Sequence, residues 1–234
     1  MIGGPLTLRG EGVSGRVLEW PSQPGVAQLI MYQQHRLPSA DDLRRWSDQL
    51  YTWGFQRIRT SALAPVAAHR VESVGFHMVQ ELVLLENDHP RDAPRPTAAT
   101  GRLLVGQHQS ASDLDHAAFG PGWSLDPPAI EEVRHATPHH RARYTGDTEL
   151  SAYALTGRDA RQGFLQRLAV RPDQQGKGLG RSLVNDCLRW LGRWRVDRVL
   201  VNTPVDNHVA LGLYETSGFS RLTERLRVFE RDLP

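Results

Sequence analysis

The chain has 234 residues, of which 39% are hydrophobic, and its 28 Lys and Arg residues nearly balance 26 Asp and Glu residues. This length suits one large domain or two small ones, and the net charge of +2 argues against a dedicated nucleic-acid binder. No stretch approaches the ~20 apolar residues of a membrane span, and no charged-then-apolar signal pattern opens the sequence, so we expect no membrane attachment.

The single cysteine, Cys187, excludes an intramolecular disulfide and fits a reducing cytoplasm. It falls within a predicted helix, where we expect a buried structural thiol and not a nucleophile. No Cys/His or His/Glu spacing indicates a metal site.

The first half is predicted to contain a strand, a helix and a second strand, in that order. Residues 27–32 suit the first strand and residues 40–50 the helix, and the segment 53–60 contains the second strand. A segment rich in proline and charge, residues 87–96, follows and contains no large apolar residue. It predicts a linker over 87–98 that separates a first domain (1–86) from a second (99–234).

The second half is predicted to form a complete α/β unit. Its strands are expected at 102–105, 140–144, 150–156, 164–170, 197–202 and 221–230. Its helices are expected at 112–119, capped by Ser110 or Ser112, and at 128–136, 180–193 and 207–216.

The two halves repeat each other in element order. Residues 194–201 followed by 215–219 match residues 53–60 followed by 72–76, with a Gly-Phe turn at the end of each pair. Chance similarity of short strand–helix–strand units is the alternative, but we favour duplication. The first copy has no glycine over residues 33–38 and has Val71 near the counterpart of Tyr214. We therefore expect it to be a structural partner and to hold no second active site.

The most informative stretch is Gln-Gly-Lys-Gly-Leu-Gly at 175–180, between a predicted strand and a predicted helix. This order places free backbone N–H groups and the positive end of a helix dipole at one point, which can hold a pyrophosphate. Glycines allow positive φ and close approach of a ligand, and Lys177 adds a positive charge. The spacing fits neither a Walker loop nor a dinucleotide-binding fingerprint.

The spacing Gln-x-x-Gly-x-Gly resembles the acetyl-CoA loop of the GNAT acyltransferase superfamily, and residues 207–219 resemble that family's last helix and exit turn. The resemblance implies an α/β fold with a mixed, mainly antiparallel central sheet and helices on both faces, preceded by a partial copy of the same fold. It implies an acetyl-CoA-dependent N-acetyltransferase that acetylates a primary amine, on a small molecule or on a peptide or protein N-terminus, as a monomer or homodimer. A non-catalytic acyl-CoA sensor is the alternative.

The resemblance also implies roles for individual residues. The strand before the loop is expected to splay from its neighbour at a bulge, so that its amides pair with pantetheine and face the thioester oxygen. Tyr214 is expected to protonate the leaving sulfur, and Asn207 to cap the last helix and contact the cofactor. The cofactor contacts are then expected on Leu168, Ala169, Val170, Gln175, Gly176, Lys177, Gly178, Leu179, Gly180, Arg181, Ser182, Asn207 and Tyr214.

The general base and the acceptor site stay open at this point. Many relatives carry Glu where this chain has Gln166, so the base could be a water chain, a residue on another strand, or unnecessary for a neutral amine. His139 and His140 are possible bases, although a surface His pair is usually inert. Trp123 could wall the acceptor pocket or close the core, and Glu131 and Glu132 could attract an amine or only complement a helix dipole. The loop-to-turn stretch is similar to the ribosomal-protein alanine acetyltransferase branch.

Overall fold

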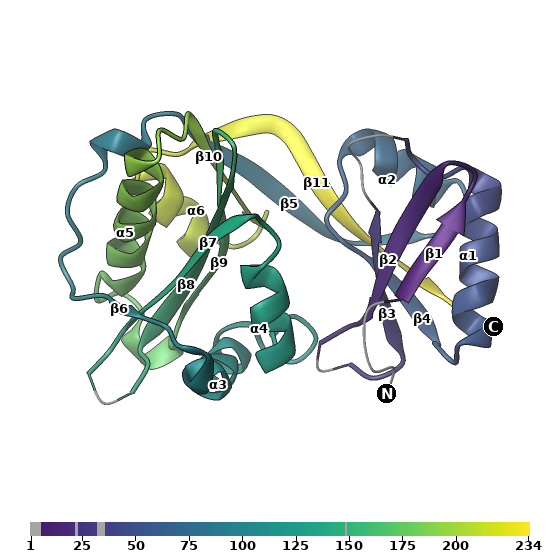
Figure 1. Cartoon of the computed structure of the whole chain (residues 1–234), viewed down its shortest axis with the longest axis horizontal. Coiled ribbons are helices and arrows are strands. Elements are labelled where there is room, and N and C mark those ends of the chain that lie inside the picture. The colour runs from purple at the N-terminus through teal and green to yellow at the C-terminus, as the bar shows by residue number, and fades with distance from the viewer. Residues whose placement is uncertain (1–5, 22, 32–35, 148) are drawn as a thin grey trace. The chain divides into compact units, whose positions relative to one another are not determined.

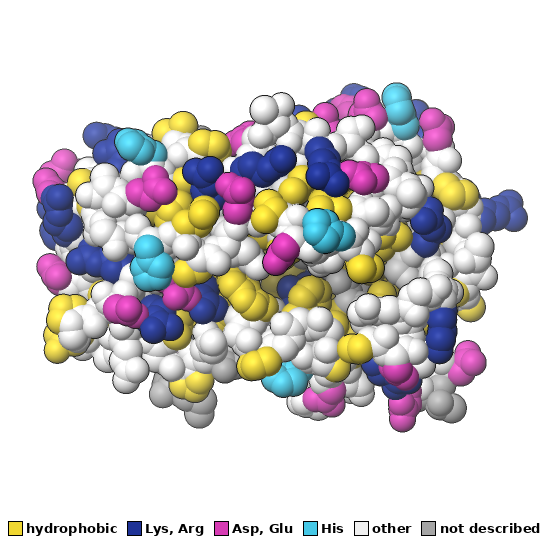
Figure 2. Space-filling model, turned by 180° about the vertical axis from the view of Figure 1, so that it is seen from behind, with side chains coloured by type: hydrophobic (Ala, Val, Ile, Leu, Met, Phe, Trp, Pro, Cys, Tyr) yellow, Lys and Arg dark blue, Asp and Glu magenta, His cyan; other side chains and the backbone are white. Residues whose placement is uncertain are grey.

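The computed structural model describes residues 6–21, 23–31, 36–147 and 149–234. The chain forms two compact units (Figure 1): unit 1 comprises residues 1–83 with 223–234, and unit 2 comprises residues 84–222. Within the described residues, no helix is long and apolar enough to cross a membrane. Basic and acidic side chains are interspersed on the face shown in Figure 2, as their near-equal numbers lead one to expect.

Unit 2 is built around a five-stranded arrangement in the order β10-β9-β8-β7-β6. Its pairs are antiparallel except β10 with β9, which is parallel. Its elements are β6 (Gly101–Arg102), α3 (His108–Phe119), α4 (Pro127–Arg134), β7 (His139–Thr145), β8 (Ala152–Asp159), β9 (Gln162–Val170), α5 (Leu179–Arg193), β10 (Arg198–Pro204) and α6 (His208–Glu215), with short 3-10 turns η1 (Pro90–Asp92), η2 (Val105–Gln107) and η3 (Pro172–Gln174). Two further strands, β5 (His77–Asn87) and β11 (Ser220–Asp232), contain residues of both units.

Helices cover both faces of this sheet. Side chains alternate along each strand, so one strand contacts helices on both faces. On β8, Tyr153 reaches Asp115 of α3, whereas Thr156 reaches Cys187 of α5. The core on the first of these faces joins α3, α4 and the strands through residues that include Leu114, Ile130 and Leu155. The predicted fold class is therefore confirmed, with a mixed and mainly antiparallel sheet between two helical layers.

The start of unit 2 differs from its sequence-based prediction. The first strand is only two residues long, because the chain turns into η2 after Arg102. The next helix begins at His108, so Ser110 and Ser112 lie inside it and cap nothing; Gln107 is the N-cap residue. For α4 the cap is Asp126, whose side chain accepts a hydrogen bond from the backbone N–H of Ala129 at 2.8 Å.

Unit 1 contains β1 (Leu6–Gly10), β2 (Val13–Glu19), β3 (Val26–Met31), α1 (Ala40–Thr52), β4 (Arg57–Thr60) and α2 (Pro65–Glu72). Its strand order is β1-β2-β3-β4 followed by β11, where Glu230 pairs with Arg59 and Phe229 enters the unit's core. The structure thus places residues 223–234 in unit 1, whereas the sequence-based division assigned everything after residue 98 to the second domain. The predicted strand end at Tyr32 and most of the glycine-free stretch 33–38 lie outside the described residues.

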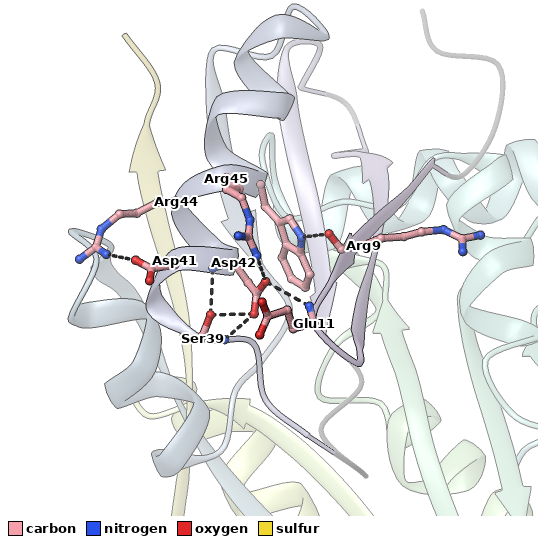
Figure 3. A network of polar contacts seen from close by, with 8 residues as sticks. Arg9, Glu11, Ser39, Asp41, Asp42, Arg44 and Arg45 are labelled. Carbon is pink, nitrogen blue, oxygen red and sulfur yellow. Dashed lines mark hydrogen bonds and ion pairs between the residues drawn. The ribbon is translucent and has the colours of Figure 1, made fainter.

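The start of α1 is closed by its own side chains (Figure 3). Ser39 and Asp42 form a capping box: the backbone N–H of Asp42 donates to Ser39 Oγ, and the backbone N–H of Ser39 donates to the Asp42 carboxylate, both at 3.0 Å. Arg45 adds an ion pair to the same carboxylate at 2.5 Å. Burial raises the pKa of Asp42, but the hydrogen bonds from Ser39, Arg45 and Glu11 outweigh it and hold the pKa at about 2.

The internal repeat is visible in the hydrogen bonds that end equivalent helices. The backbone N–H of Phe219 donates to Tyr214 O after α6, and that of Phe76 donates to Val71 O after α2. The glycine before each phenylalanine has a positive φ, 84° and 88° respectively. Val71 is therefore the counterpart of Tyr214, as predicted, and β3–α1–β4–α2–β5 repeats β9–α5–β10–α6–β11 in element order.

Residues 90–100, which we call the strap, pack along α5 instead of hanging free. Pro90 and Ala93 are buried, and Arg189 of α5 donates to Ala93 O at 3.3 Å. At Gly192 a Cβ atom would lie 3.0 Å from the Pro90 carbonyl oxygen, so a larger residue would crowd the strap. At the other end of α5, Ser182 Oγ accepts from the backbone N–H of Ala98 at 3.0 Å. The segment predicted as a linker is thus an ordered part of unit 2.

Candidate functional site

A groove of about 620 Å³ opens in unit 2 where the end of β9, the start of α5 and the body of α6 meet. Its walls come from the end of α3, the last residues of β9, the glycine loop, the first turn of α5 and one side of α6. The lining residues are Ala118, Phe119, Leu168, Ala169, Val170, Gln174, Gln175, Gly176, Gly178, Leu179, Gly180, Arg181, Asn207, Val209, Ala210, Gly212, Leu213, Tyr214 and Thr216.

One edge of β9 is open where it lines this groove. The parallel pairing of β9 with β10 runs only from Gln162 to Phe164 among the described residues. On the other side, Leu155 of β8 faces Arg167 while Thr156 faces Leu165, so Gln166 is the extra residue of a β-bulge. Among the described residues β9 has no pairing with β10 beyond Phe164, so its last residues form an edge in the groove. On this edge the Val170 carbonyl accepts a hydrogen bond from Gln175 Nε2 at 3.3 Å.

The glycine loop presents the free end of α5 to the groove. Gly176 and Gly178 have φ of 75° and 79°, and a Cβ atom at either would meet nothing within 4 Å, so the space before them is open. Gly178 is the N-cap of α5 and provides no side-chain cap, and the first turn carries no acidic residue. The first amides of α5 therefore keep their N–H groups for an anion, which the helix dipole also favours.

Gly180 is needed for a different reason. It lies inside α5 without a positive φ, and a Cβ atom there would lie 3.2 Å from Leu213 Cδ2 of α6. The glycine thus lets the first turn of α5 approach α6 closely.

The polar side chains around the loop have different orientations. Lys177 is exposed, and its Nζ donates to Gln174 Oε1 at 3.0 Å next to the groove. Arg181 reaches α6, where Nη2 donates to Thr216 Oγ1 at 2.8 Å. Ser182 is buried and its hydroxyl bonds to the strap, so the structure does not bring this side chain to the groove.

Tyr214 and Asn207 join the loop at the same groove from α6. Asn207 caps this helix, as predicted, because its Oδ1 accepts from the backbone N–H of Ala210 at 3.1 Å. Tyr214 is 5% exposed, and its ring lies 5.7 Å from that of Phe219. Burial, with a smaller contribution from the nearby Cys187, raises the pKa of Tyr214 well above 10, so the phenol is neutral at physiological pH. It can hold a proton at this end of the groove.

A buried ionic cluster lies beside the groove and was not predicted from the sequence. Asp115 of α3 is fully buried, and Arg167 of β9 donates to both of its oxygens at 2.8 and 2.5 Å. Tyr153 donates its hydroxyl to the same carboxylate at 2.5 Å; burial and this neighbour raise the pKa of Tyr153. Asp115 follows Ala111 and Leu114 at helical spacing on the buried face of α3. An acidic residue on such a face requires a partner, so the position of Asp115 in the sequence could have indicated a buried ion pair.

The candidate acceptor residues lie outside the groove lining. Trp123 contributes its backbone carbonyl, which accepts from Arg167 at 2.9 Å. Glu131 pairs with Arg134, and hydrogen bonds from that arginine lower the pKa of Glu131. His140 lies on β7 and stacks edge-on with the ring of His135. Gln166 Oε1 is buried without a hydrogen-bond partner among the described residues.

Comparison with known proteins relates this architecture to one family. Residues 109–219 match the model of the acetyltransferase (GNAT) family. A ribosomal protein bS18-alanine N-acetyltransferase of Salmonella typhimurium is 32% identical over 83 residues, which are 36% of this chain and 56% of the relative. The N-alpha-acetyltransferase 30 of Saccharomyces cerevisiae is 32% identical over 68 residues, 29% of this chain and 39% of the relative. The chain thus spans about half the length of these curated relatives, or less.

Two longer matches cover both units. A mycothiol acetyltransferase of Streptomyces coelicolor is 25% identical over 215 residues, 85% of this chain and 69% of the relative. A tandem GNAT protein from the clavulanic acid biosynthesis pathway has a TM-score of 0.67 at 15% identity and covers 97% of this chain and 81% of its own. The second match shows a shared fold with two copies.

Proposed function

We propose, because residues 109–219 match the model of the acetyltransferase (GNAT) family, that the chain transfers an acetyl group from acetyl-CoA directly to a primary amine. The observation that carries this proposal is the common groove: the end of β9, the free start of α5 and Tyr214 all line it. An anion-binding end and a proton-donating end in one groove suit a long, phosphate-bearing thioester.

The described residues fit coenzyme A in chemistry. The uncapped amides that begin at Leu179, with Lys177 and Arg181 beside them, would hold the pyrophosphate. The open backbone edge of residues 168–170 would pair with the amides of the pantetheine arm. When bound, acetyl-CoA supplies the acetyl thioester that reacts with the amine.

The chain's own groups then act on the charges that develop. A backbone N–H from residues 168–170 would face the thioester oxygen, and losing one such donor typically costs roughly 3 kcal/mol of barrier. Tyr214 would hold the proton that the leaving thiolate needs. The burial that raises the pKa of the phenol would also raise that of a thiol in the same groove, so the proton transfer stays feasible.

We propose as acceptor a small-molecule amine or the N-terminus of a peptide or protein. The curated relatives are, by their names, a ribosomal protein bS18-alanine N-acetyltransferase, an N-alpha-acetyltransferase and a mycothiol acetyltransferase. Cys187 is buried, and burial raises its pKa to about 12, which excludes it as a nucleophile at physiological pH. A lone, inert thiol suits a reducing cytoplasm, which we propose as the location.

One observation favours a second candidate, an acyl-CoA-binding module without catalysis. Gln166 stands at the β9 bulge, where many relatives have a glutamate, and it cannot accept a proton. Under the first proposal the amine must arrive neutral or lose its proton through water. Two measurements separate the candidates: calorimetric titration with CoA, and release of free CoA in the presence of a panel of amines and peptides. Turnover of any acceptor supports the enzyme, whereas binding without turnover supports the module.

A further inference from the structure

Four hydrogen bonds converge on the buried carboxylate of Asp115, two on each oxygen. Oδ2 accepts from Arg167 Nε at 2.8 Å and from the Tyr153 hydroxyl at 2.5 Å. Oδ1 accepts from Arg167 Nη2 at 2.5 Å and from the backbone N–H of Leu125 at 2.7 Å. The carboxylate, carried by α3, is therefore saturated by groups from β8, β9 and the segment 120–125, which we call the α3–α4 loop.

Arg167 extends this connection to the wall of the groove. Its Nη2 also donates to the Trp123 carbonyl at 2.9 Å, and its guanidinium lies 3.5 Å from the centre of the Phe119 ring. Phe119 lines the groove, and so does Leu168, the residue that follows Arg167 on β9. One arginine thus fixes the end of α3, the α3–α4 loop and the strand that forms the opposite wall.

The cluster borders the end of the groove that is remote from the glycine loop. An extended strand rises about 3.3 Å per residue, and Leu168 precedes Val170 and the loop at 175–180 in chain order. Arg167 and Phe119 are therefore on the side where the thioester and the incoming amine would meet. Apolar residues of similar volume often replace a buried ion pair without loss of stability, so stability alone does not require this arrangement.

We propose that Arg167 and Asp115 form a positioning pair, which holds Phe119 and the α3–α4 loop against β9 and thereby shapes the acceptor end of the groove. The effect on the acceptor rests on the proposed acetyltransferase function, whereas the effect of the pair on the position of the α3–α4 loop does not. Phe119 touches the groove, and Arg167 acts through it.

The test compares the full chain with the double variant Asp115→Leu/Arg167→Met, which leaves no unpaired buried charge. The control is Arg161→Met/Asp197→Leu, which removes an exposed ion pair of the same type at the other end of β9. Hydrogen–deuterium exchange is measured on residues 119–125 and 175–185, CoA affinity by calorimetry, and the acceptor KM on the amine panel. If the first double variant fails to fold, Arg167→Lys takes its place, since it keeps the charge but loses the two-point contact.

We expect faster exchange in residues 119–125 and unchanged exchange in residues 175–185, with CoA affinity within about twofold. The acceptor KM should rise about tenfold or more, since the loss of about 1.4 kcal/mol of contact with the bound amine is tenfold in affinity. Unchanged exchange in 119–125 overturns the proposal, and so does an unchanged acceptor KM despite faster exchange. If the unmodified chain acetylates no amine, the proposed function fails, while the exchange result still decides whether the pair holds the loop.

Discussion

The Asp42 carboxylate and the backbone N–H of Ser39 form a 3.0 Å hydrogen bond at the start of α1, the position that corresponds to the glycine loop in unit 2. Asp41 and Asp42 place two acidic side chains in this first turn, whereas α5 has none in its own. The Asp42 carboxylate accepts from the Ser39 N–H, the Ser39 hydroxyl accepts from the Asp42 N–H, and the two carboxylates repel an anion. Unit 1 therefore has a structured helix start that is closed to a pyrophosphate.

The first prediction is that the chain binds one equivalent of CoA, and that Gly178→Val removes it. A valine at φ of 79° is strained and adds methyl groups where the ligand would lie. Gly75→Val is the matched control, because Gly75 has φ of 88°, equally open surroundings and a place in unit 1. Calorimetric titration with CoA is measured on the unmodified chain and on both variants. Two bound equivalents in the unmodified chain, or unchanged CoA binding by Gly178→Val, would contradict this prediction. Gly180→Val suits this test less well, because its side chain would also push on Leu213.

The second prediction concerns the stability of unit 1 against acid. The pKa of Asp42 is about 2 in the fold against an ordinary 3.8, so the ionised form contributes stability above about pH 4. This shift corresponds to about 2 kcal/mol, which is lost as the pH falls toward 2. Asp42→Asn should therefore lower the free energy of unfolding near pH 6, and the difference from the unmodified chain should shrink toward pH 3. Urea unfolding at several pH values measures this difference in the free energy of unfolding. A difference that does not change with pH would show that the variant loses stability through packing and not through the charge of Asp42.

The third prediction concerns the strap. Gly192→Ala places a Cβ atom 3.0 Å from the backbone of Pro90 and Arg91. Alanine normally stabilises a helix interior by about 1 kcal/mol relative to glycine, but here the crowding should reverse the sign and cost about 1–3 kcal/mol. Gly106→Ala, with no atom within 4 Å of its Cβ, is the control. A Gly192→Ala variant as stable as the unmodified chain would show that the strap moves aside freely.

The fourth prediction is that Tyr214→Phe lowers kcat about a hundredfold or more while acetyl-CoA affinity changes little. The hydroxyl is the part that would donate the proton, and losing one hydrogen bond to a bound cofactor costs only about 1 kcal/mol. The ring stays beside Phe219, so the melting temperature should barely change. Since the pKa of Tyr214 lies above 10, its ionisation should cause no loss of activity below pH 10. Full kcat in the phenylalanine variant would reduce Tyr214 to a core residue.

Local patterns predicted much of unit 2. The glycine spacing at 176–180 located the start of α5, and Asn207 located the start of α6. The exit turn at Gly218 showed the repeat, because a positive φ after a helix strongly favours glycine. These features depend on residues close together in the chain, so sequence reasoning finds them.

Long-range contacts explain what the sequence analysis missed. Proline and charge in the strap predicted a linker, but close packing on Gly192 depends on a helix far along the chain. The pair of Asp115 with Arg167 joins α3 to β9, and no local pattern connects them. The end of β11 joins unit 1 because Glu230 pairs with Arg59 across the sheet. In each of these cases, a contact with residues far away in the sequence decides where the segment lies.

Acetyl transfer by this chain can be followed directly from cofactor to amine. The chain is incubated with acetyl-CoA that carries a deuterated acetyl group and with the panel of amines and peptide N-termini, and each acceptor is weighed by mass spectrometry. We expect a labelled acetyl group on at least one amine, with an equal amount of free CoA, and loss of both in Gly178→Val but not in Gly75→Val. One equivalent of bound acetyl-CoA with no labelled amine would contradict this expectation, and would make the chain a binding module.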